Sequence, residues 1–387
     1  MQKMDNNKIS PFDPFIPVYR MLRWTGFYRP LNRDKTKLQH FLRICYRIFT
    51  FVFIVLGYNA THSIFIAQVM TGVNFITMST HIGHCSYYPG IINNALLTTM
   101  SLTSILEVCV SDPIFGGNNE KDEECLNSNK MTGRRMWLSV MSMVSFTALF
   151  YILAPILKRF QDENVNPSPS YQPFDNKTWK GFLSNMSMEV IPIFWAGYGH
   201  LALDYLVAIY YYQAYTQLKI LKINLENFIN EMSTVASTNA ITIHMYKDEI
   251  NPDIEKRLLY YVNRYERVVW YVWFNFYQDN DESVILLFQI NPVSASFVFL
   301  FAYFVMIQTQ IFLYCYFGAL VLYESESVFT SFYLGDWLSL SPRLRRQVIC
   351  AMARWALPIV PRVSTIIPLS LNTFVMVSSI IQNPAIY

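Results

Sequence analysis

The chain has 387 residues, of which 53% are hydrophobic and only 15% charged, and its net charge is +3. Soluble domains usually carry about 25% charged residues, so this composition excludes a typical soluble multidomain protein. The small net charge, without a basic stripe, excludes a nucleic-acid binder. The sequence has no hydrolase elbow, Walker loop, zinc-protease motif or paired-cysteine motif, and so predicts no enzyme activity, metal site or cofactor.

Apolar blocks recur along the chain, and each is long enough to cross about 30 Å of hydrocarbon as a helix. The sequence therefore predicts an all-α integral membrane protein with seven transmembrane helices. The expected spans are 44–68, 76–104, 134–156, 190–218, 268–291, 294–317 and 363–386.

The distribution of Lys and Arg orients these spans, because cytoplasmic loops carry an excess of both. With the N-terminal segment 1–43 in the cytoplasm, only four of the 30 Lys and Arg residues fall outside, all in loop 157–189. The C-terminus is then extracellular. Residues 219–267 are expected to extend the fourth and fifth spans into the cytoplasm rather than to form a separate domain.

Two glycosylation sequons fall in the expected extracellular loop. They are Asn176-Lys-Thr and Asn185-Met-Ser. Because glycans are added to Asn-X-Ser/Thr on the extracellular side, both sequons agree with the orientation derived from charge.

Aromatic residues repeat at helical spacing in three of the spans. Phe146 and Phe150 share a face of the third span, and Phe194, Tyr198 and Leu201 share a face of the fourth. Phe297, Phe301 and Phe304 do the same in the sixth. Such stripes more often serve helix packing or a lipid-facing belt than a ligand site, but three of them in the outer halves of three helices are also compatible with a small apolar pocket.

An acidic cluster, Asp279, Asp281 and Glu282, falls near the middle of the fifth expected span. One charge at mid-bilayer costs about 2.5–3.5 kcal/mol, so these carboxylates do not face lipid. Either they face an aqueous cation path, or the helix is broken or shifted so that they lie at an interface.

The last third of the chain is similar to the insect odorant receptor family, most strongly over about 290–380. The resemblance rests on Tyr314-Cys-Tyr-Phe-Gly318, Glu324-Ser325, Tyr333, Asp336-Trp337, Arg343-Leu-Arg-Arg346, Met352, Arg354, Pro358 and Pro368-Leu-Ser-Leu-Asn-Thr-Phe374.

This resemblance implies a subunit of a tetrameric, non-selective cation channel gated by volatile hydrophobic odorants in the plasma membrane of olfactory neuron dendrites. Odorant-binding (tuning) subunits of the family assemble with a shared co-receptor, which has a large insertion before the fifth span. The short 219–267 stretch here resembles a tuning subunit. Residues 318–362 are implied to pack subunits together in the cytoplasm, and 363–387 to line the pore through Ser378, Ile381, Gln382 and Ala385.

Family pockets lie in the outer halves of the second, third, fourth and sixth spans. The resemblance therefore implies a set of ligand-binding side chains on those spans. They are Tyr87, Tyr88, Phe146, Phe150, Tyr151, Phe194, Trp195, Tyr198, Leu201, Phe297, Phe301 and Phe304.

Three other classes of membrane protein fit the sequence less well. Gustatory receptors, the sibling family, carry Thr-Tyr and a later Gln-Phe in the last helix, whereas here Thr373 precedes Phe374 and no Gln-Phe follows. A G-protein-coupled receptor would place the N-terminus outside, against the charge distribution. A secondary transporter would show repeated halves, which this sequence lacks.

Overall fold

The computed structural model describes residues 10–26, 108–109, 112–161, 174–239, 252–273, 295–340, 342–363 and 367–382, with most of 38–50. These residues are mostly helical. In chain order the elements are the 3-10 turn η1 (Asp13–Phe15), α1 (Ile16–Thr25), the 3-10 turn η2 (Pro113–Phe115), α4 (Glu120–Gln161), α5 (Trp179–Asn239), α6 (Pro252–Trp273), α7 (Ala295–Leu334), the 3-10 turn η4 (Trp337–Ser339), α8 (Pro342–Trp355), β1 (Arg362–Val363), β2 (Ile367–Pro368) and α9 (Leu371–Gln382).

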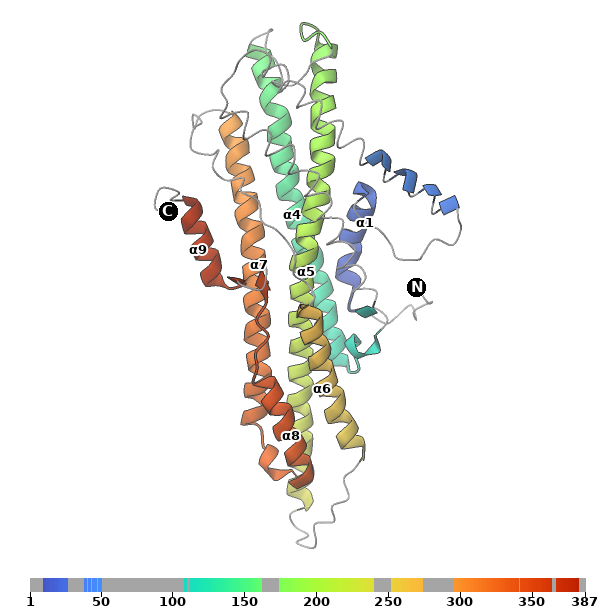
Figure 1. Ribbon diagram of the computed structural model, residues 1–387, viewed down its shortest axis with the longest axis vertical. Coiled ribbons are helices and arrows are strands. Elements are labelled where there is room, and N and C mark those ends of the chain that lie inside the picture. The colour runs from blue at the N-terminus through green and yellow to red at the C-terminus, as the bar shows by residue number, and fades with distance from the viewer. Residues whose placement is uncertain are drawn as a thin grey trace.

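The helices form an elongated bundle in which α5 is the central member (Figure 1). α4, α6 and α7 run alongside α5, and α1 packs against it from the N-terminal side. α5 is apolar over most of its circumference because neighbours cover it, and residues such as Leu206, Ala214 and Leu221 are fully buried. α8 lies near the end of α7, and α9 lies beside the other half of α7 (Figure 1).

Among the described residues, three helices are long and apolar enough to cross a membrane. These segments are Glu120–Gln161, Trp179–Glu231 and Phe304–Leu334. They coincide with the third, fourth and sixth expected spans. The first two expected spans lie largely or wholly outside the described residues. Most of the fifth does too, including Asp279, Asp281 and Glu282.

The helices α4 and α5 are longer than the apolar runs from which the sequence predicts them. α4 begins at Glu120, not near 134, and acidic residues in its first turn stabilise that end of the helix dipole. α5 has 61 residues and rises about 90 Å at 1.5 Å per residue, three times the thickness of the hydrocarbon. Both helices therefore continue beyond any bilayer that their apolar parts cross.

The seventh expected span begins later than the sequence suggests. Instead of helix from 363, Val363 pairs with Ile367 in an antiparallel ribbon, as β-branched residues favour. The helix starts at Leu371 because the Ser370 hydroxyl accepts a hydrogen bond from Thr373 N at 3.2 Å and so caps it.

A buried polar layer joins α4, α5 and α6. The Arg264 guanidinium is fully buried and donates to Gln217 Oε1 at 2.7 Å. Asn224 Nδ2 donates to both oxygens of Asp122, at 3.0 and 3.2 Å. Burial lowers the pKa of Arg264, the neighbouring Tyr260 and Asp122 partly offset this, and an arginine remains protonated in either case. This layer fixes how the three helices meet, because an unpaired buried polar group is costly.

Candidate functional site

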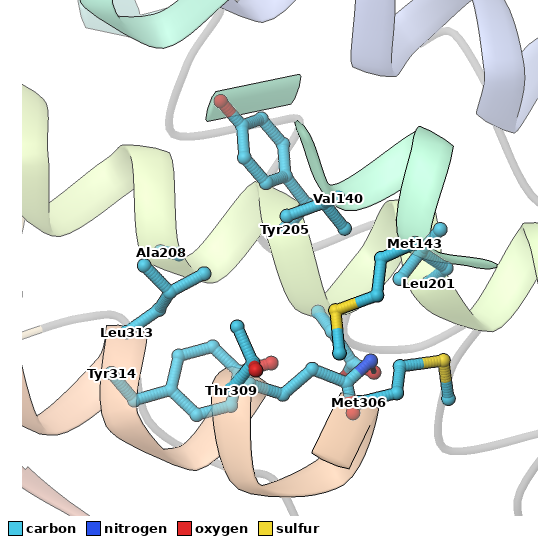
Figure 2. Close-up of a pocket in the computed structure, with 11 residues that line it drawn as sticks. Val140, Met143, Leu201, Tyr205, Ala208, Met306, Thr309, Leu313 and Tyr314 are labelled. Atoms are coloured by element: carbon cyan, nitrogen blue, oxygen red, sulfur yellow. Dashed lines mark hydrogen bonds between the residues drawn. The ribbon is translucent and has the colours of Figure 1, made fainter. Parts of the chain in front are cut away.

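A cavity lies between α4, α5 and α7, within their membrane-length parts. Its walls combine apolar side chains with a few polar ones (Figure 2). The lining residues are Val140 and Met143 from α4, Leu201, Asp204, Tyr205 and Ala208 from α5, and Met306, Thr309, Gln310, Leu313 and Tyr314 from α7.

The cavity is small, with a volume of about 20 Å³. That space holds about one water molecule, whereas an engineered apolar cavity of about 150 Å³ binds benzene. Met143 reaches from α4 towards the α7 side chains, and Met306 lines the same space (Figure 2). Methionine is unbranched and adapts its shape easily, so these two side chains are the parts of the wall best able to move for a larger occupant.

The polar side chains of the cavity are held in different ways. The Tyr205 hydroxyl donates to Gly133 O at 2.6 Å, and the Thr309 hydroxyl donates to Val305 O at 2.8 Å. Both protons are therefore used by backbone carbonyls.

Asp204 is the acidic member of the lining. It is only 7% exposed, and its Oδ2 accepts a hydrogen bond from Gln310 Nε2 at 3.3 Å. The Tyr314 hydroxyl also interacts with the Asp204 carboxylate. This group joins α5 to α7 at the wall of the cavity.

A second apolar cluster lies further along α4 and α5, toward the α4–α5 connection. Phe182, Met186 and Val190 form its buried centre, and Tyr151 and Phe194 pack against it. Tyr151 and Phe194 meet edge to face, with ring centroids 5.8 Å apart. This outer cluster holds the ends of the two helices together.

The expected ligand-binding residues are spread over several environments. Leu201 lines the cavity. Tyr151 and Phe194 belong to the outer cluster, and Tyr198 OH lies 3.4 Å from Ser145 Oγ of α4. Trp195 faces α1, because it packs on Trp24 with centroids 4.4 Å apart and donates to Thr25 O at 3.2 Å.

The aromatic residues that the sequence predicted as ligand-binding on α4 and α7 lie apart from the cavity wall. Phe146 and Phe150 contact each other edge to face at 4.7 Å, and Phe146 is 55% exposed. Phe301 is also 55% exposed, and Phe304 is half-buried. Tyr87, Tyr88 and the side chain of Phe297 lie outside the described residues.

Of the expected pore residues, Ser378 is described with its side chain. It lies on α9, where its hydroxyl donates to Gln308 Oε1 of α7 at 3.0 Å. Ile381 and Gln382 end α9 with side chains outside the described set, and Ala385 lies beyond it.

The two sequons lie in different structural environments in the folded chain. Asn176 occupies a turn between exposed residues 175 and 177. Asn185 lies within α5, is 6% exposed, and uses its Nδ2 to donate to Phe174 O and Asn176 Oδ1, both at 2.8 Å. A glycan would replace one of the two hydrogens on that nitrogen and break at least one of these bonds, at a side chain that is buried, so the folded structure does not favour the modification expected at Asn185.

Sequence reasoning missed most of the cavity wall, including Asp204, Thr309 and Gln310. A signal for them was present, because a polar residue inside an apolar span is rare and faces the bundle interior. Because the prediction followed the aromatic stripes, it placed the ligand-binding residues on neighbouring faces of the same helices.

Comparison with known proteins agrees with the features of the C-terminal third. The family model described as 7tm Odorant receptor matches residues 283–381. Two Drosophila melanogaster proteins, odorant receptor 19a and putative odorant receptor 19b, are each 36% identical to this chain over 70 residues. That stretch is 18% of this chain and 18% of each relative.

Residues 283–381 of the chain are therefore similar to the insect odorant receptor family. This confirms the resemblance found in the sequence.

A structural comparison finds similarity over nearly the whole chain. The insect olfactory receptor OR5 from Machilis hrabei, solved alone and in complex with eugenol, matches with a TM-score of 0.66. Each alignment covers 95% of both chains at 13% sequence identity, so the likeness is one of fold. The cavity described above therefore lies within a fold that this chain shares with a solved olfactory receptor.

Proposed function

We propose that this receptor is the odorant-binding subunit of a heteromeric, odorant-gated, non-selective cation channel. A volatile, largely hydrophobic molecule binds between α4, α5 and α7 and favours the open pore. The observation that carries this proposal is the cavity, which is enclosed by three helices of membrane-spanning character and lined mainly by apolar side chains. Such sites bind small molecules by shape, with a few polar groups setting orientation.

The packing of α7 supports a direct path from the cavity to α9. Gln310 and Tyr314 line the cavity, while Gln308 and Phe312 contact α9. Phe312 meets Phe374 edge to face at 5.4 Å, and Gln308 accepts from Ser378 at 3.0 Å. A ligand that shifts α7 acts on α9, the proposed pore helix, provided that it binds the open state more tightly than the closed one.

The far end of α7 supports the proposed packing role of 318–362. Trp355 of α8 is fully buried against Phe332 of α7, with centroids 5.1 Å apart. Ile359 N donates to Ser325 Oγ at 3.0 Å. We infer that this compact end holds subunits together in a heterotetramer with co-receptor chains, in an arrangement of seven spans with a cytoplasmic N-terminus, in the dendritic membrane of olfactory neurons.

The remaining predicted site residues enter the proposal with distinct roles. Residues near the outer cluster, such as Tyr151 and Phe194, shape the approach to the cavity. Ser378, Ile381, Gln382 and Ala385 are proposed to face the pore of the open channel. Asp279, Asp281 and Glu282 are proposed to face water near the cation path.

The test is membrane current in cells that express this chain with an odorant receptor co-receptor, and in cells that express either subunit alone. A panel of volatile aromatics is applied to each. Odorant-evoked cation current in the paired cells only is the expected result. Current from this chain alone, or silence to every volatile despite surface delivery, would contradict the proposal.

A further inference from the structure

The position of Asp204 is costly unless the cavity uses it. A carboxylate inside a membrane span costs about 2.5–3.5 kcal/mol on insertion scales. Asp204 lies in the most buried stretch of α5 and forms part of the cavity wall. Intramembrane acidic residues of this kind commonly mark a ligand or ion site.

The hydrogen bond from Gln310 to Asp204 can be replaced by one from a ligand. A strong hydrogen bond to a carboxylate has a donor–acceptor distance of about 2.7–2.9 Å. Gln310 Nε2 lies 3.3 Å from Asp204 Oδ2, so this bond is long for its kind. Both side chains line the cavity, and a ligand there could donate to the same oxygen in place of Gln310.

The Tyr314 hydroxyl interacts with Asp204 itself, and the two remaining hydroxyl groups of the wall already donate to backbone carbonyls. Tyr205 donates to Gly133 O and Thr309 donates to Val305 O. A ligand that only accepts hydrogen bonds therefore gains little from the hydroxyls of Tyr205 and Thr309, whereas a ligand that donates one finds an acceptor oxygen in Asp204.

We propose that the cavity selects small apolar ligands that carry one hydrogen-bond donor, a hydroxyl or amino group, which binds the Asp204 carboxylate in exchange for Gln310. This inference rests on the proposed function of the cavity. The exchange also releases a bond between α5 and α7, so the donor group both orients the ligand and frees the helix that contacts α9.

The test compares matched ligands that differ in the donor alone. Benzyl alcohol and benzyl methyl ether form one pair, and para-ethylphenol and para-ethylanisole another. Half-maximal concentrations for current are measured in cells that express the receptor and co-receptor. We expect the alcohol or phenol to act at about tenfold lower concentration than its ether, the effect of one hydrogen bond to a charged group.

Asp204→Val should remove this preference by raising the half-maximal concentration of the alcohol about tenfold while changing that of the ether little. Asp204→Asn keeps the size of the side chain and one acceptor oxygen, and should narrow the preference even if the valine variant fails to reach the surface. Thr330→Val is the matched control on α7, since its hydroxyl donates to Glu326 O and it is not part of the cavity wall, and it should leave the preference intact.

Equal potency of alcohol and ether in the unaltered receptor, or an unchanged preference in both Asp204 variants, would overturn the inference. Current evoked by any volatile, without donor preference, would leave the proposed function standing and remove only this inference. Silence to all volatiles, with normal surface delivery, would remove the proposed function itself.

Discussion

At the scale of single residues, two methionines line the cavity that we propose as the odorant site. Met143 of α4 and Met306 of α7 enclose a space of about 20 Å³ together with Leu201 of α5. Because methionine changes shape at little energetic cost, the cavity can enlarge without rearrangement of its helices.

We predict that Met143→Ala shifts odorant preference towards larger molecules. Removing the thioether enlarges the cavity, and a methylene in an apolar pocket is worth about 1–3 kcal/mol. Odorants one or two methylenes longer should therefore gain about tenfold in potency relative to short ones. Concentration–response curves over a homologous series in receptor and co-receptor cells measure this.

Leu149→Ala is the control, because Leu149 lies on the same helix but is 56% exposed and distant from the cavity wall. An unchanged size preference in the Met143 variant, or an equal shift in the Leu149 variant, would be inconsistent with this cavity as the binding site.

The aromatic residues show what residue type alone can predict. Trp195 packs on α1, Phe194 on the outer cluster, and Phe146 is mostly exposed, although all three were expected at a ligand site. An aromatic ring suits lipid, protein and ligand equally, since each offers apolar contact. A polar group in an apolar span suits few environments, so Asp204 and Gln310 carried the stronger signal for the cavity.

At the scale of elements, α7 connects the cavity, α9 and the segment that leads into α9. The closest approach is at Gly318, where an added Cβ would lie 2.5 Å from Leu369 Cβ and 2.9 Å from Leu369 O. Only glycine fits there without moving α7 away from that segment.

We predict that Gly318→Ala destabilises the receptor by about 1–3 kcal/mol, the usual cost of forcing extra atoms into a packed contact. The thermal unfolding temperature of detergent-purified receptor should fall, and so should the amount of receptor delivered to the cell surface. Gly197→Ala is the matched control, because nothing lies within 4 Å of its added Cβ. It should be neutral, or stabilising by about 0.5–1 kcal/mol. Equal effects of the two substitutions would show that the contact with Leu369 is unimportant.

Hydropathy located α4, α5 and α7 but not their ends. The sequence of α4 turns polar before 134, yet the helix continues back to Glu120, where Asp122 joins the buried polar layer. Hydropathy reports depth in hydrocarbon, whereas helix ends are set by caps and by packing between helices. The ribbon before α9 was missed for the same reason, since its apolar residues fit a span equally well.

At the scale of the whole molecule, the glycosylation state reports on topology. Asn176 lies in a turn between two helices of membrane-spanning character, and Asn185 is buried in α5. If this end of the bundle is extracellular, only the first sequon is suited to carry a glycan.

We predict that Asn176→Gln removes the glycosidase-sensitive electrophoretic shift of the receptor and that a variant with the second sequon disabled by Ser187→Ala retains it. A receptor without any such shift, or one that loses it only in the Ser187 variant, would contradict the proposed orientation or the fold of this segment.

The central claim is that an odorant binds between α4, α5 and α7. The most direct measurement is the structure of the receptor–co-receptor complex with an activating odorant bound. We predict odorant density in contact with Leu201, Asp204 and Met306, in a cavity larger than the present one because Met143 or Met306 has moved. Odorant density elsewhere, for example at the outer cluster around Phe182, with this cavity unchanged, would contradict the account.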